Sequence, residues 1–188
     1  MNLFRRKKEP RPARTEFEAV VAAYEGKLIA YVARITGSRS SAEDIVQEAF
    51  IKLSQYWRGE LSPGPAVSAW LYKAAHHAAV DHIRREKFRT ETHKRHKAES
   101  EILAEEQSQT ASGDDAQRAA AARRVRAALA SLPERERSLV VLKVYENKSY
   151  NEIAGITGLK TGNIGYILHT AMKKLANIIT QKEKGGAQ

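Results

Sequence analysis

Apolar residues recur at three- and four-residue intervals along most of the chain, which is the period of helices with one buried face. In the first half the pattern predicts three helices. The first begins with a capping box at Thr15 and Glu18 and ends at Gly37. Its apolar stripe is Phe17, Val20, Val21, Tyr24, Leu28, Ile29 and Val32. Ser40 or Ser41 opens the second, whose stripe is Ala42, Ile45, Val46, Ala49, Phe50 and Leu53.

Two prolines and two glycines between residues 59 and 65 predict a loop, and a third helix is expected from about residue 67 to 85. The second half predicts four more helices, the first over residues 117–130 and the second capped at Ser131. The third is opened by a capping box at Ser149 and Glu152 and closed by Gly158. The last follows over residues 161–180. No strand-like alternation occurs, so the fold class is all-α.

Charge divides the 188-residue chain into three blocks. The net charge is +8 over residues 1–97, −6 over residues 98–116 and +8 over residues 117–188. Two basic blocks joined by an acidic stretch rich in Ser, Gln and Ala predict two small helical domains and a flexible linker. The expected boundaries are a basic disordered tail over 1–14, a domain over 15–90, a linker over 91–116, a domain over 117–181 and a tail over 182–188.

Composition narrows the classes of function. The overall charge of +10 and the isoelectric point near 9.8 favour an anionic partner, nucleic acid before a membrane surface. The chain has no cysteine, which rules out disulfides and thiolate metal sites. It shows neither a signal peptide nor an apolar run near the ~20 residues of a membrane helix, so we expect a cytoplasmic protein without membrane insertion. No nucleophile–base pair or glycine-rich phosphate loop is evident, so neither enzymatic activity nor a cofactor is expected.

The most specific signal is a helix-turn-helix pattern between Ser149 and Leu175. Ala154 is small where two helices cross, Gly158 allows a tight left-handed turn, and Ile164 is apolar where the second helix packs on the first. These three positions are typical of DNA-binding units. An ordinary helical hairpin is the alternative.

The last predicted helix has two distinct faces. Its buried stripe is Ile164, Leu168, Ala171 and Leu175. The other side would lie in a DNA major groove, with its first turns facing base edges and its lysines the phosphates. The expected DNA-binding residues there are Lys160, Thr161, Asn163, Tyr166, His169, Thr170 and Lys173.

Residues 117–178 resemble domain 4 of the extracytoplasmic-function (ECF) sigma factors. The residues that carry the resemblance are Leu129 to Arg137, Tyr145 to Ala154, Gly158, and Asn163 with Ile164. In that family the domain reads the −35 promoter element and packs on the flap of the polymerase β subunit. The chain departs from the family where arginines are common, at Ile167 and Thr170, which implies a thinner phosphate clamp.

The segment Ser41 to Leu53 resembles the polymerase-binding helix of sigma domain 2. The resemblance implies that its outward surface docks on the coiled coil of the β′ clamp. The same polar residues would also suit a simply solvated helix face. The expected polymerase-binding residues are Asp44, Gln47, Glu48, Phe50 and Lys52.

The segment Ala69 to Arg85 resembles the helix that opens and reads the −10 element. A cationic stripe beside aromatic residues suits single-stranded DNA, whose bases stack and whose phosphates need neutralising. Leu71, Ala74, Ala78 and Ile83 are expected to face the core, and Trp70 is either a core residue or a stacking platform. The expected −10 residues are Trp70, Lys73, His76, His77, Arg84 and Arg85, with Val80 and Lys87 on the same side.

These features together predict a nucleoid-associated sigma factor that bridges core RNA polymerase (β′ clamp and β flap) and promoter DNA. The family is commonly held inactive by an anti-sigma factor, although no residue here identifies such a partner. A free-standing helix-turn-helix regulator with a helical sensor domain is the main alternative, and a nucleic-acid enzyme the weaker one. The polymerase-docking pattern at Asp44 to Leu53 favours the sigma factor.

Overall fold

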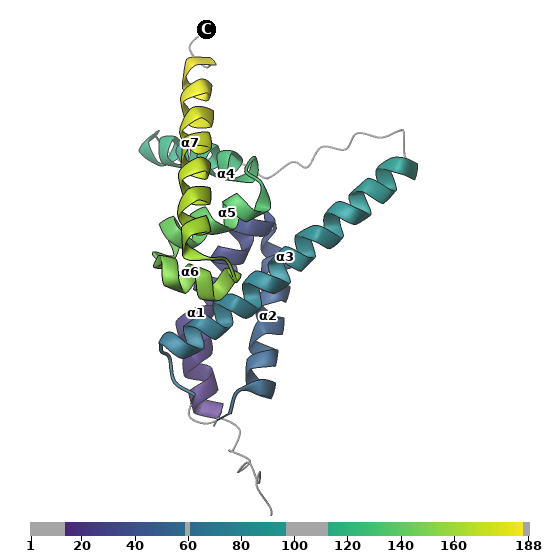
Figure 1. The fold of residues 1–188 in the computed structure, drawn as a ribbon, viewed down its shortest axis with the longest axis vertical. Coiled ribbons are helices and arrows are strands. Elements are labelled where there is room, and N and C mark those ends of the chain that lie inside the picture. Colours follow the sequence, from purple (N-terminus) through teal and green to yellow (C-terminus); the bar gives the residue numbers. More distant parts are fainter. Residues whose placement is uncertain (1–13, 59–60, 97–112, 186–188) are drawn as a thin grey trace, which may run out of the picture.

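The computed structural model describes residues 14–58, 61–96 and 113–185 (Figure 1). These residues form seven α-helices and one π-helical turn, which confirms the predicted all-α class. The helices are α1 (Arg14–Thr36), α2 (Arg39–Tyr56), α3 (Pro65–His96), α4 (Gly113–Ala130), α5 (Glu134–Val140), α6 (Tyr150–Thr157) and α7 (Thr161–Gly185), and the π-helical turn η1 (Val141–Tyr145) follows α5.

The first three helices pack on one another around a shared apolar core. Helix α1 ends at Gly37 as predicted: this residue has φ +79°, and its N–H donates to the carbonyl of Ala33 at 2.9 Å. The start of α2 differs from the prediction. Its N-cap is Ser38, whose hydroxyl accepts from the N–H of Ser41, because the turn at Gly37 leaves only one residue before the helix begins.

Helix α3 is longer than the sequence predicted. It begins at Pro65, since the first helical position needs no N–H donor, and it continues to His96. From Arg84 to Thr90 every side chain is exposed, and this end of α3 projects away from the other helices (Figure 1). The prediction ended this helix near residue 85 because the apolar stripe stops there. A helix segment that is exposed on all sides can continue without such a stripe.

The cap between α4 and α5 also differs from the prediction. The hydroxyl of Ser131 donates back to the carbonyl of Ala128 at 2.7 Å, so it serves the end of α4 and not the start of α5. Pro133 is the N-cap of α5, with no side-chain cap bond. The chain continues from α5 into η1, where the N–H of Glu146 donates to the carbonyl of Val141 at 3.1 Å.

The two helical groups share a continuous buried cluster. Helix α6 packs against α3, and α1 contacts α4, α5 and η1 (Figure 1). The sequence predicted two domains but not this close packing.

The segment predicted as a linker is helical at both of its ends. Helix α3 reaches His96 and α4 begins at Gly113, so both ends of the 91–116 segment are helical, and residues 97–112 lie outside the described part. The tail predicted over 1–14 lies outside it except for Arg14, the first residue of α1. Helix α7 continues to Gly185, into the segment predicted as a tail, and the last three residues lie outside. Within the described ranges, no helix is long and apolar enough to cross a membrane.

Candidate functional site

Helices α6 and α7 form the predicted helix-turn-helix. Ser149 and Glu152 make both bonds of the capping box, and the shared hydrogen bonds lower the pKa of the Glu152 carboxyl. Gly158 ends α6 with φ +74°, a left-handed conformation that glycine adopts without steric cost. Ile164 is fully buried against this unit. Each residue that the sequence predicted to cap, turn or pack this motif therefore does so in the structure.

Helix α7 presents the predicted groove face to solvent. Ile164, Leu168, Ala171 and Leu175 are buried as expected. Tyr166 is 74% exposed, and Thr170 is half-buried, with its hydroxyl donating to the carbonyl of Tyr166 at 3.1 Å. The other predicted DNA-binding residues of this helix and its leading turn are all exposed: Lys160, Thr161, Asn163, His169 and Lys173.

Two neighbours of this face have other contacts. Lys174 pairs with Glu136 of α5 at 2.6 Å, so part of its charge is already neutralised. A Cβ at Gly165 would meet the ring of Tyr150 at 3.6 Å, an ordinary contact distance. Gly165 therefore fits closely beside α6, without being required there by steric crowding.

Helix α3 carries the predicted −10 face, but with a correction. Lys73, His77, Arg84 and Arg85 are exposed, and Trp70 is half-buried against the core. His76, in contrast, is only 6% exposed and is hydrogen-bonded to Tyr31 of α1 at 3.0 Å. Burial, and next the neighbouring His77, lowers the pKa of His76 from 6.5 to about 4, so it is neutral near pH 7 and unsuited to binding a phosphate.

The error at His76 has a geometric cause. The observed buried stripe of α3 runs through Val67, Leu71, Ala75 and Ala79, so it shares Leu71 with the predicted stripe but then follows the positions one residue on from Ala74 and Ala78. Because α6 and α1 both cover α3, its buried face is also wider than a two-domain prediction allows, and it includes Tyr72, His76 and Val80. The solvent-exposed face of α3 is therefore narrower than predicted. Lys73, His77, Arg84 and Arg85 lie on it, and we call these residues the cationic strip.

Helix α2 presents a polar surface on the side away from the core. Asp44, Gln47, Glu48 and Lys52 are exposed, and Lys52 pairs with Glu48 at 2.8 Å. Phe50 was predicted as a polymerase-binding residue, but it is only 6% exposed and packs edge-on against Phe17 at 6.2 Å between ring centroids. The apolar stripe of α2 includes position 50, which places Phe50 in the core.

Sequence reasoning missed two apolar features. Ile51 is 48% exposed beside Gln47 and Glu48, one turn along the same surface of α2. A hollow of about 120 Å³ also lies between α4, α5, η1 and α7. Its floor includes Leu129 and Leu175, and exposed apolar side chains surround it: Val125, Val144, Met172 and Ile179. The spacing of Met172, Leu175 and Ile179 could have indicated this second apolar face of α7.

Comparisons with known proteins agree with this arrangement. Residues 20–89 match the family model described as sigma-70 region 2, and residues 122–175 match the one described as sigma-70, region 4. These matched segments contain the exposed polar surface of α2, the cationic strip of α3 and the groove face of α7. The chain thus has the two regions of an RNA polymerase sigma factor.

Individual relatives give the family. The chain is 30% identical over 146 residues to the ECF RNA polymerase sigma factor SigF of Caulobacter vibrioides, covering 78% of this chain and 75% of that one. It is 25% identical over 175 residues to the RNA polymerase sigma factor YlaC of Bacillus subtilis, covering 91% of this chain and 96% of that one. The chain belongs to the ECF family of RNA polymerase sigma factors.

A solved structure has the same fold. The sigma factor RpoE of Bartonella quintana, in complex with the anti-sigma factor NepR, aligns with a TM-score of 0.66 at 20% identity. The alignment covers 88% of this chain and 98% of that one. As a sigma factor, this chain binds core RNA polymerase and directs transcription initiation from promoters; such proteins are regulatory and non-catalytic.

Proposed function

We propose that the groove face of α7 reads the −35 element and that the cationic strip of α3 binds the −10 element. The observation that carries this proposal is the separation of faces on α7: four residues pack inward, and the predicted base-reading residues Asn163 and Tyr166 are exposed. Side chains in the first turns of a groove helix reach base edges, and later cations meet phosphates. Lys173 is the phosphate contact in this arrangement.

On α3 the proposed DNA contacts are Lys73, His77, Arg84 and Arg85, with Lys87 and Arg89 extending the strip along the projecting end. Their spacing places several cations along one strand of nucleic acid, which favours binding through phosphates. Trp70 contributes its exposed edge beside Lys73. His76 is left out of this set because it is buried and neutral.

Two surfaces are proposed to bind the polymerase. Asp44, Gln47, Glu48 and Lys52 of α2 would dock on the β′ clamp, with Ile51 as an apolar contact at the centre of this polar surface. Buried apolar contacts within polar surroundings are typical of strong protein interfaces. The apolar hollow of α4, α5, η1 and α7 would receive the β flap.

An anti-sigma factor is the proposed regulatory partner, because the solved sigma factor of the same fold from Bartonella quintana is in complex with one. We propose that the active protein is cytoplasmic and associated with the nucleoid. There it acts as a non-enzymatic subunit of the polymerase holoenzyme. In this proposal residues 15–90 act as sigma domain 2 and residues 117–181 as sigma domain 4.

Reconstitution with core RNA polymerase tests the proposal. The purified chain, mixed with core enzyme and genomic DNA, should give discrete run-off transcripts that are absent with either component alone. The promoters recovered should share two elements. A chain that binds specific DNA tightly at physiological salt without polymerase, and adds no transcripts, would instead be a free-standing regulator.

A further inference from the structure

A pocket of about 500 Å³ lies between α1, the start of α3 and the turn from η1 to α6. We call it the basic pocket. Its charged and aromatic lining residues come from all three segments: Lys27 and Arg34 of α1, Tyr72 of α3, and Tyr145, Glu146 and Lys148 of the turn. The volume is within the range of about 300–1,000 Å³ that is usual for pockets that hold small molecules. None of the DNA-binding residues proposed above lines it.

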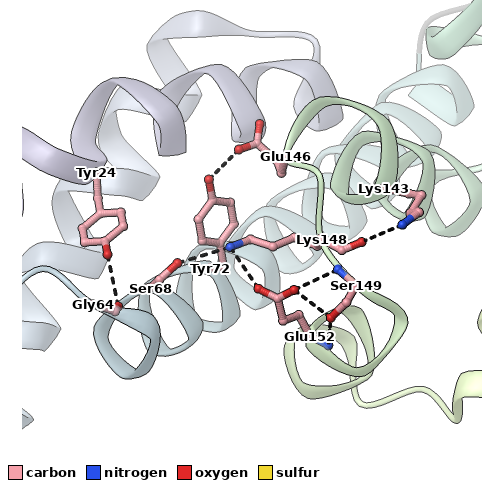
Figure 2. A network of polar contacts seen from close by, with 9 residues as sticks. All are labelled: Tyr24, Gly64, Ser68, Tyr72, Lys143, Glu146, Lys148, Ser149 and Glu152. Carbon is pink, nitrogen blue, oxygen red and sulfur yellow. Dashed lines mark hydrogen bonds and ion pairs between the residues drawn. The ribbon is translucent and has the colours of Figure 1, made fainter.

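The lining of the basic pocket carries a net positive charge. Lys27, Arg34 and Lys148 supply three positive charges and Glu146 one negative charge, which leaves a balance of +2. The Glu146 side chain is only 9% exposed, and its carboxylate accepts a hydrogen bond from the hydroxyl of Tyr72 at 2.5 Å (Figure 2). Because this carboxylate is buried and already bound, the cations dominate the accessible part of the pocket.

Arg34 has hydrogen-bond donors to spare. Its guanidinium lies 4.5 Å over the ring of Tyr145, and its distance of 3.9 Å from Glu146 is too long for a hydrogen bond. Within the part of the chain that the structure describes, Arg34 forms no side-chain hydrogen bond. A guanidinium offers five N–H donors in a planar fork that matches the oxygens of a phosphate. The side chain is 34% exposed, so a ligand can reach it.

The two lysines differ in their surroundings. The ammonium of Lys148 lies 4.5 Å over the ring of Tyr72, 3.3 Å from the hydroxyl of Ser68 and 3.6 Å from the carboxylate of Glu152 (Figure 2). Its charge is therefore partly neutralised. Lys27 is exposed and has no ion pair among the described residues. It lies two turns before Arg34 on the same face of α1, about 10 Å along the axis, which suits a ligand with more than one phosphate.

Tyrosine rings supply the apolar part of the lining. Tyr24, Tyr72 and Tyr145 all border the basic pocket, and Ala30 lies between the two cations of α1. The hydroxyl of Tyr24 donates to the carbonyl of Gly64 at 3.1 Å, which holds this ring in place (Figure 2). Aromatic side chains stack on the bases of nucleotides with little preference for one base. Free phosphate-binding donors beside tyrosine rings therefore fit a nucleotide.

We propose that the basic pocket binds a free nucleoside polyphosphate, with its phosphates on Lys27 and Arg34 and its base against the tyrosine rings. This proposal is independent of the DNA-binding and polymerase-binding roles proposed above, so the purified chain alone can test it. A nucleic-acid strand carries the same chemical groups, and the experiments below distinguish these two sources.

Isothermal titration calorimetry of the full chain at physiological ionic strength provides the first test. Adenosine 5′-triphosphate and guanosine 5′-triphosphate are titrated separately, and inorganic triphosphate supplies the phosphates without a base. We expect a nucleotide to bind about tenfold more tightly than inorganic triphosphate, because base stacking adds to phosphate binding. Equal affinities would overturn the nucleotide as the ligand.

Two pocket variants and one control connect this binding to the cations. Lys27→Ala removes an exposed charge, and Arg34→Lys keeps the charge but loses the planar fork. Each should weaken nucleotide binding about tenfold, because charge-assisted hydrogen bonds are lost. Arg14→Ala removes an exposed cation at the start of α1 and should bind as the natural chain does. Unchanged affinity in Lys27→Ala, or an equal loss in Arg14→Ala, would overturn the proposal.

A single introduced thiol places the ligand, because the natural chain has no cysteine. In Ala30→Cys the thiol borders the basic pocket, and in Ala22→Cys it lies on an exposed part of α1 outside it. At a nucleotide concentration ten times the Kd, about a tenth of the chains remain free, so alkylation of Ala30→Cys should slow about tenfold. Alkylation of Ala22→Cys should not change. Equal rates with and without nucleotide in Ala30→Cys would place the nucleotide elsewhere and overturn the site.

A short single-stranded oligonucleotide in the same alkylation assay separates the two sources of phosphate. Stronger protection of Ala30→Cys by the nucleotide supports the proposal. Protection by the oligonucleotide that equals or exceeds that by the nucleotide would assign the basic pocket to a nucleic-acid strand and overturn the free nucleotide as its ligand.

Discussion

The hydroxyl of Tyr31 and the Nδ1 atom of His76 lie 3.0 Å apart in the core, although 45 positions separate the two residues in the chain. Tyr31 is fully buried, and its ring also contacts that of Tyr72, with 5.4 Å between centroids. The bond satisfies two polar groups that would otherwise be costly inside a protein. His76 thus joins α1 to α3 and has a structural role.

We expect this histidine to make the fold sensitive to mild acid. Its folded pKa of about 4 lies below the unfolded value of 6.5, so the unfolded chain binds the proton more readily. The stabilisation is complete above pH 6.5 and is lost as the pH falls from 6.5 towards 4, by about 3 kcal/mol in total. Urea unfolding followed by circular dichroism across this range measures the loss.

The control for acid sensitivity is His76→Gln, which keeps a hydrogen-bonding group near Tyr31 but cannot titrate. Its free energy of unfolding should change much less between pH 6.5 and pH 4 than that of the natural chain. An equally steep pH dependence in the variant would place the titrating group elsewhere.

Reversing the polar surface of α2 should remove polymerase binding and spare the fold. Asp44, Gln47 and Glu48 are exposed, so the triple change to lysine should alter stability only slightly, since surface substitutions usually stay within about 0.5 kcal/mol each. Like charges set against a partner cost several kcal/mol of binding. A pull-down with core polymerase measures the loss, and circular dichroism checks the helices.

Helix α1 offers a control with the same change in charge. Glu18, Ala22 and Glu25 are exposed at similar spacing, and their triple change to lysine adds as much positive charge as the α2 variant. This control should bind polymerase normally. If the α2 variant also bound polymerase normally, the polar surface of α2 would be only a solvated helix face and not a binding site.

Substitutions on α7 should separate base reading from phosphate binding. Asn163→Ala or Tyr166→Ala should change which −35 sequences are used, because a good base contact is worth about 1–3 kcal/mol of discrimination. Lys173→Ala should weaken all promoters alike and reduce the salt dependence, because a phosphate contact carries no sequence information. Genome-wide run-off transcription with each variant distinguishes the two effects. Unchanged promoter choice in all three would refute the groove face.

The capping box of α6 should contribute measurably to stability. Ser149→Ala removes the hydroxyl that accepts from the N–H of Glu152, a loss of about 1 kcal/mol for an N-cap. Thermal unfolding should show a lower midpoint. Ser149→Thr, which retains a capping hydroxyl, should recover most of the difference, and equal loss in both variants would argue against capping as the cause.

Phe50 should behave as a core residue. Phe50→Ala is expected to cost about 3–5 kcal/mol of unfolding free energy because it leaves a cavity beside Phe17. Phe50→Leu, which fills most of that space, should cost less and should bind polymerase as the natural chain does. If a folded Phe50→Leu variant lost polymerase binding, Phe50 would have to be a polymerase-binding residue after all.

Local chemistry let the sequence predict much of the site. The capping box at Ser149, the left-handed turn at Gly158 and the buried stripe from Ile164 to Leu175 depend on residues within one or two helical turns of each other. Such interactions depend only on short segments of the chain. They therefore predict the helix-turn-helix, and the outward direction of Asn163 and Tyr166, even when the rest of the fold is not known.

Only the tertiary structure decided which residues of α3 face solvent. A 3.6-residue period leaves the edges of a stripe ambiguous, and the true width of the buried face depends on how many helices cover it. His76 is a core residue because Tyr31 of α1 bonds to it. Tyr72 is buried because Glu146, in the turn between η1 and α6, accepts its hydroxyl hydrogen bond. These partners are 45 and 74 positions apart in the chain, and no local pattern encodes a contact between residues so distant in sequence.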